Sequence, residues 1–187
     1  MSDYEVTETK CVYDGTLSSV RIDTVRMPDG TTAEREIIEH VDAVATVPLA
    51  DDDRVLLLRQ YRPAVRGRLL ELPAGILDVD GEEPEEAARR ELAEEAGLSA
   101  TALQRMVTFS NSAGWSEETT TIYLATGLRE ATTPQDFVAE HEETDMELVW
   151  VPLAEAAAMA TRGDITDAKT LIGILLTAAR RGVDLRQ

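Results

Sequence analysis

The sequence predicts an α/β fold in which helices cover the faces of a mixed sheet. The prediction rests on the order of its segments: apolar strands come first, then one helix, then further strands and two final helices. The 187 residues are 43% hydrophobic and 29% charged, which is typical of a globular domain with a real core. We expect residues 1–42 to form a small N-terminal β extension and residues 43–187 the main domain.

The N-terminal half is expected to consist of strands. Residues 10–40 have the pattern of short strands, with a turn signal at Pro28-Asp29-Gly30 between two alternating runs. Longer apolar strands are expected at residues 41–49, 54–61 and 69–77. The last of these is broken by the Pro-Ala-Gly sequence at residues 73–75.

The first helix is predicted from its two ends. Pro84 suits a first helical turn, the acidic run at residues 82–86 suits the positive end of the helix dipole, and Gly97 suits its end. Three more strands are expected at residues 103–109, 119–128 and 146–151. Two helices should follow at residues 153–161 and 168–181, the second capped by Asp167.

The net charge of −18 argues against nucleic acid as a partner, because such a surface repels phosphate backbones. No apolar run is long enough to cross a membrane, so no membrane partner is expected. The single cysteine, Cys11, excludes an intramolecular disulfide and favours a cytoplasmic setting. Cys11 is expected to be a packed strand residue, and Trp115 and Trp150 are expected to pack in a core or an interface.

The most informative feature is the acidic end of the first helix. Glu91 and Glu95 are four residues apart and share a helix face, with Glu94 beside them. Like charges at this spacing destabilise a helix by roughly 0.2–0.5 kcal/mol per pair. One interpretation is an ordinary solvated helix. The other is a site for a hard cation such as Mg²⁺, which prefers carboxylate and carbonyl oxygens.

A longer pattern around this helix decides between the two interpretations. Residues 75–98 resemble the Nudix box, Gly-x5-Glu-x7-Arg-Glu-U-x-Glu-Glu-x-Gly-U, where U is a bulky aliphatic residue. Every defined position from Glu82 to Leu98 matches that pattern. The one departure is that six residues, not five, separate Gly75 from Glu82, and this insertion falls in a loop.

The resemblance implies a Nudix α/β/α sandwich and a Mg²⁺ or Mn²⁺ cofactor. It assigns Glu91, Glu94 and Glu95 as metal ligands, joined by the backbone carbonyl of Ala74. It also implies that the two remaining charged positions of the box brace the loop and orient ligands. These two residues are Glu82 and Arg90.

Other segments are similar to the ADP-ribose pyrophosphatase branch of this superfamily. They are residues 59–62 (Arg-Gln-Tyr-Arg), 71–75 (Glu-Leu-Pro-Ala-Gly) and 163–173. The implied reaction is metal-dependent hydrolysis of the pyrophosphate bond of a nucleoside diphosphate sugar, with ADP-ribose giving AMP and ribose 5-phosphate. Ala113 stands where this branch usually has a proline, so ADP-glucose, GDP-mannose or a dinucleotide remain alternatives.

A second alternative is a Nudix module that binds a nucleotide sugar without cleaving it. Such modules typically lose metal glutamates, whereas this sequence keeps all three, which favours catalysis. By resemblance, the general base lies outside the box in the loop before a late strand. We expect Glu142 to be that base, with Glu140 and Glu143 as alternatives and His141 less favoured, and Glu94 to take part in catalysis as well.

The residues that hold the substrate are expected to come from several segments. Arg35 and Arg62 are candidates for binding phosphates or stacking on adenine. Gly114, Ser116 and Glu118 lie in the loop that the branch uses for substrate specificity. By resemblance, the N-terminal strands of a partner subunit complete the adenine site, so the chain is expected to form a homodimer.

Overall fold

The computed structural model describes residues 3–131 and 145–185. The chain divides into two compact units. The first contains Met1–Asp42 and Phe109–Thr119, and the second contains Ala43–Thr108 and Thr120–Gln187.

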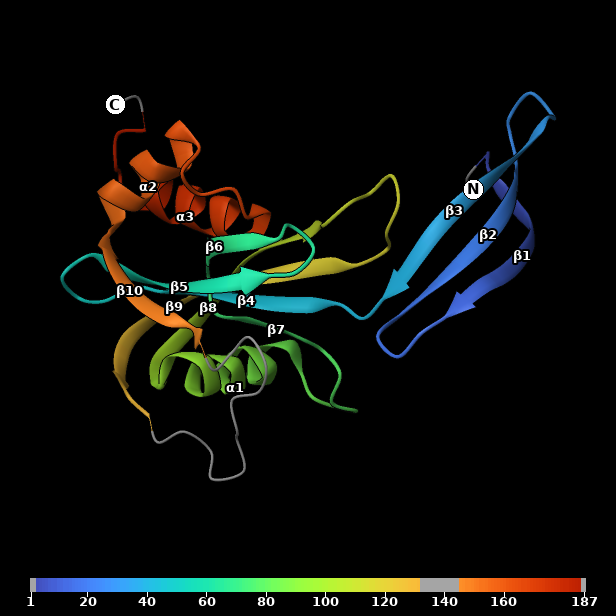
Figure 1. Cartoon of the computed structure of the whole chain (residues 1–187). Helices are drawn as coiled ribbons and strands as arrows, with labels where there is room; N and C mark the ends of the chain where they lie inside the picture. Colours follow the sequence, from blue (N-terminus) through green and yellow to red (C-terminus); the bar gives the residue numbers. More distant parts are fainter. Residues whose placement is uncertain (1–2, 132–144, 186–187) are drawn as a thin grey trace. The chain divides into compact units, whose positions relative to one another are not determined.

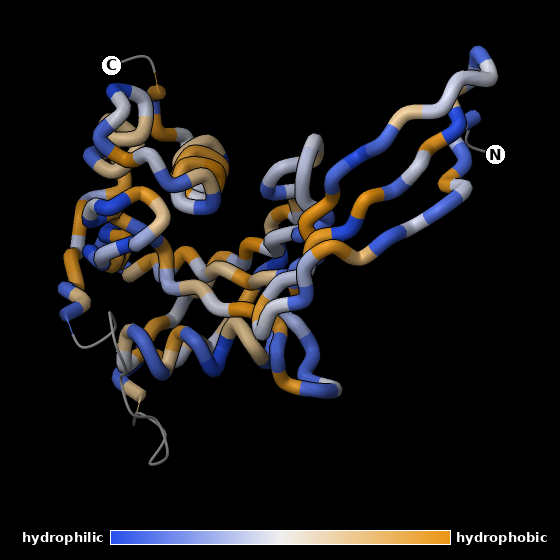
Figure 2. The backbone as a smooth tube through the Cα atoms, turned by 45° about the vertical axis from the view of Figure 1, so that its right-hand side comes forward, coloured by the Kyte–Doolittle hydropathy of each residue, from blue (hydrophilic) through white to orange (hydrophobic). Residues whose placement is uncertain are grey.

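The first unit is built on a three-stranded antiparallel sheet in the order β1-β2-β3. Its strands are β1 (Glu5–Asp14), β2 (Ser18–Arg26) and β3 (Thr32–His40). Every residue of β1 is exposed, and both hydrophilic and hydrophobic residues occur along the three strands (Figure 2). β1 begins at Glu5, earlier than the sequence predicted, because its first six residues are mostly polar and contain no apolar run to reveal a strand.

The second unit contains two sheets, in the orders β7-β4-β9-β8 and β10-β5-β6. β4 pairs in parallel with β9 and antiparallel with β7, so the expected mixed sheet is confirmed. The strands are β4 (Ala43–Pro48), β5 (Arg54–Arg62), β6 (Gly67–Glu71), β7 (Ala74–Ile76), β8 (Leu98–Ser110, whose last two residues belong to the first unit), β9 (Thr119–Glu130, whose first residue belongs to the first unit) and β10 (Glu147–Pro152).

The expected strand at residues 69–77 proves to be two strands in different sheets. β6 ends at Glu71 and β7 begins at Ala74, so the sequence correctly indicated a break but placed it too late. Proline has no N–H to donate to a sheet ladder, which explains why Pro73 lies at the transition. The chain thus passes from one sheet to the other immediately before the Nudix-like helix.

Three helices complete the second unit: α1 (Pro84–Ala96), α2 (Leu153–Arg162) and α3 (Ala168–Arg180). In Figure 1, α1 lies on one side of the strands of this unit, and α2 and α3 lie on the other. Val44 of β4 packs with Ala87 and Ala88 of α1 in a buried cluster. Within the described residues, no helix is long and apolar enough to span a membrane.

The helix ends follow the sequence prediction closely. Pro84 occupies the first turn of α1, and Gly97 ends it in the left-handed conformation with φ of 62°, which glycine adopts at little cost. Asp167 caps α3, accepting a hydrogen bond from the Thr170 N–H. Local capping chemistry therefore sets the bounds of both helices.

The expectation that Cys11 is packed is wrong, because Cys11 lies on β1 and is exposed. Trp115 and Trp150 are 57% and 36% exposed, so neither lies in the core of the chain, and their packing in an interface stays a prediction. The guanidinium of Arg54 lies over the indole ring of Trp150, 5.5 Å from the centre of that ring, which is a cation–π contact.

Candidate functional site

The candidate site is built on the C-terminal half of α1, where three acidic side chains project from one region of the helix. The helix faces a sheet, and the charged side chains of Glu91 and Glu94 are largely shielded from solvent, at only 14% and 15% exposure. The buried side of α1 is made of small or aliphatic residues, among them Ala88 and Leu92. Their burial against the sheet fixes the rotation of the helix and thereby the direction of the acidic face.

Arg90 lies at the centre of these carboxylates. Its Nε and Nη2 donate to both oxygens of Glu82 at 3.0 Å, which is a bidentate pair. Its Nη1 donates to Glu91 at 2.7 Å and to Glu94 at 3.0 Å. The hydrogen bonds that Arg90 donates to Glu82, followed by the charges of Glu91 and Glu82, raise the pKa of Arg90 above its ordinary value. One guanidinium thus holds three carboxylates together.

Glu95 is held by β7, the strand that precedes the helix in the chain. The backbone N–H of Ala74 donates to Glu95 Oε2 at 2.9 Å. The neighbouring Gly75 lies so close to Glu91 that an added Cβ would stand 2.0 Å from its Oε1. β7 therefore contacts two glutamates of α1 directly, and only glycine leaves the space that the Glu91 carboxylate occupies.

The site retains negative charge that Arg90 does not fully offset. Burial raises the pKa of the Glu91 carboxyl, and the charges of Glu94 and Asp78 add to this, against the lowering effect of Arg90. A further cation would stabilise the ionised form of such a group. The donors present are carboxylate oxygens, the type that Mg²⁺ and Mn²⁺ prefer, so the residues fit the implied metal.

The carboxylates are arranged around the guanidinium and do not already form a cage. In residues 3–131 and 145–185, no group of three or more acidic, histidine or cysteine side chains has a geometry ready to hold a metal ion. The pairing of Glu91 and Glu94 with Arg90 accounts for this arrangement.

A second charged network lies nearby in the fold and was not predicted as a unit. Glu71, at the end of β6, is only 1% exposed, and it accepts both a bidentate pair from Arg62 and a hydrogen bond from Lys169. Burial raises the pKa of the Glu71 carboxyl, but Arg62 and Lys169 outweigh this effect and lower it. Arg62, predicted to bind phosphates, is thus already engaged by a carboxylate, and its side chain remains 42% exposed.

The sequence contained only a weak signal for this network. Glu71 follows two leucines at the end of an apolar strand, where a buried charge requires partners. Lys169 is 98 residues further along the chain, and only the docking of α3 brings it to Glu71.

Four predicted substrate residues belong to the first unit. Arg35 lies on β3 and donates to the carbonyl of Glu34, and Glu118 lies 3.6 Å from His40. Ser116 donates its N–H to the Ser112 carbonyl, and Gly114 lies in the same loop. These four residues lie in the first unit and the acidic face of α1 lies in the second, so their contact with substrate stays a prediction.

The predicted base, Glu142, lies outside the described residues, as do the alternatives Glu140, His141 and Glu143.

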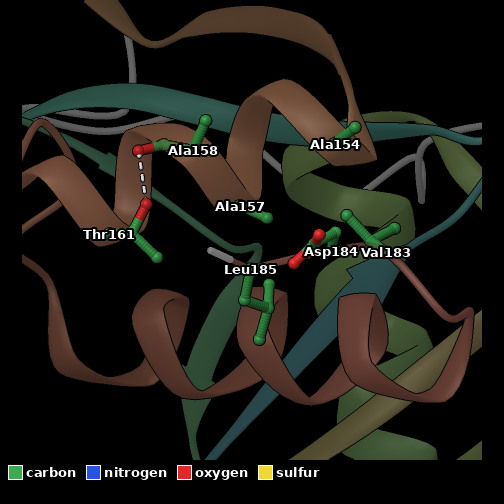
Figure 3. A pocket seen from close by; sticks show the side chains of 7 residues that line it. All are labelled: Ala154, Ala157, Ala158, Thr161, Val183, Asp184 and Leu185. Carbon is green, nitrogen blue, oxygen red and sulfur yellow. Dashed lines mark hydrogen bonds between the residues drawn. The ribbon is translucent and has the colours of Figure 1, made fainter. Parts of the chain in front are cut away.

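A pocket of about 270 Å³ lies away from the acidic face, between α2 and the C-terminal segment (Figure 3). Its walls are mainly small or apolar, from Ala154, Ala157, Ala158, Thr161, Val183, Asp184 and Leu185. With Asp184 as its one ionisable lining residue, it offers no set of groups for binding a cation and a diphosphate.

Comparison with known proteins gives a consistent result. The NUDIX domain model matches residues 39–172. An ADP-ribose pyrophosphatase of Mycobacterium tuberculosis is 43% identical over 177 residues, which is 95% of this chain and 84% of the relative. A methanol dehydrogenase activator of Bacillus methanolicus is 30% identical, covering 89% of this chain and 88% of the relative.

A crystal structure described as an ADP compounds hydrolase has the same fold, with a TM-score of 0.82. It covers 98% of both chains at 23% sequence identity, so the likeness concerns the fold alone. It confirms the sandwich of helices and mixed sheet expected from the sequence.

Proposed function

The chain belongs to the Nudix family, and we propose that it hydrolyses the pyrophosphate bond of ADP-ribose to give AMP and ribose 5-phosphate. One observation carries the proposal: Arg90 gathers Glu82, Glu91 and Glu94 on the same helix whose Glu95 is held by the Ala74 N–H. The full-length similarity to an ADP-ribose pyrophosphatase supports the choice of substrate.

We propose Mg²⁺, or Mn²⁺ in its place, as the cofactor, held by Glu91, Glu94, Glu95 and the Ala74 carbonyl. Such an ion, when bound, lowers the pKa of a water molecule and offsets the charge of the diphosphate. The protein's own contribution is to keep the carboxylates partly desolvated and pre-arranged, which Arg90 and the Ala74–Gly75 backbone do.

In the proposed reaction, a water oxygen forms a bond to one phosphorus atom as the bond between that phosphorus and the bridging oxygen breaks. The water proton passes to the Glu142 carboxylate, and the leaving phosphate departs with the bridging oxygen. Glu140 and Glu143 remain the alternative bases. Arg62 and Arg35 are proposed to bind the phosphates or the adenine, with Gly114, Ser116 and Glu118 contributing to specificity.

The test is product analysis. Purified protein is incubated with a divalent cation and a panel of ADP-ribose, ADP-glucose, GDP-mannose and dinucleotides, and the phosphorylated products are identified. We expect AMP and ribose 5-phosphate from ADP-ribose, at the highest kcat/KM of the panel. Faster turnover of another compound of the panel would make that compound the assigned substrate. If no compound is hydrolysed, the protein is not this enzyme, and the alternative of a nucleotide-sugar-binding module replaces it.

We further propose a homodimer in the cytoplasm, with residues 1–42 contributing to the interface. Apolar residues near the N-terminus are about half exposed or more: Tyr4 just before β1, and Val6, Val12 and Tyr13 within it. Among the described residues, β1 is an edge strand of its sheet, and such an edge can pair with another chain. Sedimentation velocity at micromolar concentration should give the mass of two chains, and a Val12→Lys variant should shift toward one. A monomeric wild-type protein would reject the dimer.

A further inference from the structure

The segment that joins β6 to β7 is held by the first turn of α3. The Thr170 hydroxyl accepts a hydrogen bond from the Leu72 N–H at 2.9 Å, and it donates to Asp167 Oδ2 at 2.6 Å. Thr170 and Leu72 are both completely buried. A buried N–H without an acceptor is strongly unfavourable, so this hydroxyl fixes the position of the Leu72 backbone.

The residue before Leu72 is held from the same turn. Lys169 Nζ donates to Glu71 Oε2 at 2.5 Å and to Asp167 Oδ1 at 3.0 Å. Asp167 thereby uses one oxygen for Lys169 and the other for Thr170, whose backbone N–H it also caps at 3.0 Å. One turn of α3 therefore binds two consecutive residues of the segment, one through its side chain and one through its backbone.

The other end of the segment contacts the candidate site. The Pro73 carbonyl accepts from the Thr46 N–H of β4 at 2.9 Å, and the Ala74 N–H donates to Glu95 Oε2 at 2.9 Å. Only Pro73 lies between the residue that Thr170 holds and the residue that holds Glu95. The backbone that Thr170 holds is thus only two residues from the N–H that binds the Glu95 carboxylate.

The close approach of α3 to this segment is built into the sequence. At Gly173, one turn after Thr170, an added Cβ would stand 2.7 Å from Leu72 Cδ1 and 2.9 Å from Val47 Cγ2. The glycine lets the helix backbone approach β4 and Leu72 closely enough for the Thr170 hydroxyl to reach the Leu72 N–H.

We propose that Thr170 and Lys169 are positioning residues, which set the Glu71–Ala74 segment and through it the Glu95 carboxylate for binding a divalent cation. This inference rests on the proposed function, because it assigns Glu95 to the cation. It differs from that function in concerning residues that touch neither cation nor substrate.

The test measures Mn²⁺ binding to the protein without substrate, by the loss of the free Mn²⁺ signal in electron paramagnetic resonance. Thr170→Val keeps the shape of the side chain but removes the acceptor for the Leu72 N–H. We expect its Mn²⁺ affinity to fall by about 10–100-fold, the range typical of residues that orient metal ligands. Thr170→Ser restores a hydroxyl and should bind within about 3-fold of the wild type.

Thr177→Val is the matched control. Thr177 is a completely buried threonine on the same helix, and its hydroxyl faces Met106 Sδ at 3.8 Å rather than the Glu71–Ala74 segment. An equal loss of Mn²⁺ affinity in Thr177→Val and Thr170→Val would overturn the proposal, as would wild-type affinity in Thr170→Val.

Lys169→Met covers the case in which Thr170→Val does not fold. Removing a positive charge near the acidic face should, by Coulomb attraction alone, strengthen cation binding. Loss of the hydrogen bond from Lys169 to Glu71 should instead weaken cation binding, by about 10-fold. Weaker binding supports the positioning role, and unchanged or stronger binding contradicts it.

The chemical shift of the Ala74 amide separates this inference from the proposed function. In metal-free protein, Thr170→Val should shift the Ala74 ¹⁵N–¹H signal, while Thr177→Val should leave it in place. If the wild type binds no Mn²⁺, the proposed function fails, and the amide signal still decides whether α3 positions the segment. An unshifted Ala74 signal in Thr170→Val would overturn the inference even if the wild type binds Mn²⁺.

Discussion

Each unit of the molecule contains one arginine that holds three carboxylates, and the two clusters differ in their exposure to solvent. In the first unit, Arg21 binds Asp23, Glu39 and Glu117, whose side chains are 9%, 39% and 50% exposed. In the second unit, Arg90 binds Glu82, Glu91 and Glu94, which are 13%, 14% and 15% exposed. Charge count alone does not distinguish them.

The pKa of Glu91 in the Arg90 cluster changes in the opposite direction to the pKa values of Asp23 and Glu39 in the Arg21 cluster. A hydrogen bond from Thr9, helped by Arg21, lowers the pKa of Asp23, and one from Ser19, with Arg21, lowers that of Glu39. Burial raises the pKa of Glu91 despite the contact with Arg90. The Arg21 cluster is therefore a satisfied ion network, whereas the Arg90 cluster retains charge suited to another cation. Desolvation, not charge spacing, marks the candidate site.

The largest contrast should come from removing each arginine. Arg90→Gln leaves desolvated carboxylates unpaired and should lower the free energy of unfolding by about 3–5 kcal/mol. Arg21→Gln leaves more exposed carboxylates and should cost about 1 kcal/mol. Urea unfolding can be followed separately, because Trp115 lies in the first unit and Trp150 in the second. In a Trp115→Phe background the fluorescence reports the second unit, and in Trp150→Phe it reports the first.

Added Mg²⁺ sharpens this contrast. It should restore part of the stability lost by the second unit of Arg90→Gln by mass action, since Glu91 and Glu94 no longer pair with the arginine. It should leave the first unit of Arg21→Gln, reported by Trp115, unchanged. Equal losses in the two arginine variants, or equal responses to Mg²⁺, would contradict the difference drawn between the clusters.

A smaller effect, of opposite sign in the two units, is expected for single carboxylates. With chelator present, Glu91→Gln removes a charge that burial disfavours. Its free energy of unfolding should therefore equal that of the wild type or exceed it by up to about 1 kcal/mol. Asp23→Asn weakens the charged hydrogen bonds from Thr9 and Arg21 and should cost about 1–2 kcal/mol. The same tryptophan reporters measure both, and a destabilised Glu91→Gln protein would show that its charge is fully compensated.

The smallest effect is the pH dependence of these differences. The pKa of Asp23 is lower in the folded protein, so Asp23 stabilises the fold above its unfolded-state pKa, and this stabilisation is lost as pH falls through the folded-state pKa. The pKa of Glu91 is higher in the folded protein, so the stability that Glu91 contributes is present below its unfolded-state pKa and is lost as pH rises through the folded-state pKa. On acidification, the free energy of unfolding that Asp23→Asn loses, and any that Glu91→Gln gains, should therefore both become smaller.

The sequence predicted those features that depend on local chemistry. Pro84 and Gly97 bounded α1, Asp167 capped α3, and the spacing of Glu91, Glu94 and Glu95 placed them on one region of the helix. Each of these depends on residues within a few positions of one another. Together with the order of the segments and the resemblance to the Nudix box, they indicated the fold class and the type of site.

Features that depend on distant segments could not be predicted. The Glu71–Lys169 and Leu72–Thr170 contacts each join residues 98 positions apart, and no local pattern connects them. The exposure of Trp115 and Trp150 depends on which faces other elements cover. The transfer of the chain between sheets after Glu71 depends on β4, which pairs with Ala74.

The most direct test of the central claim compares two glutamates of α1. Glu95 is held by the Ala74 N–H within the proposed cation site, whereas Glu86 lies on the exposed side of the same helix. With ADP-ribose and Mg²⁺, Glu95→Gln should lower kcat by on the order of 100-fold or more, with an unchanged circular dichroism spectrum, and Glu86→Gln should keep wild-type turnover. Near-wild-type turnover by Glu95→Gln, or wild-type turnover that persists in excess chelator, would contradict the account.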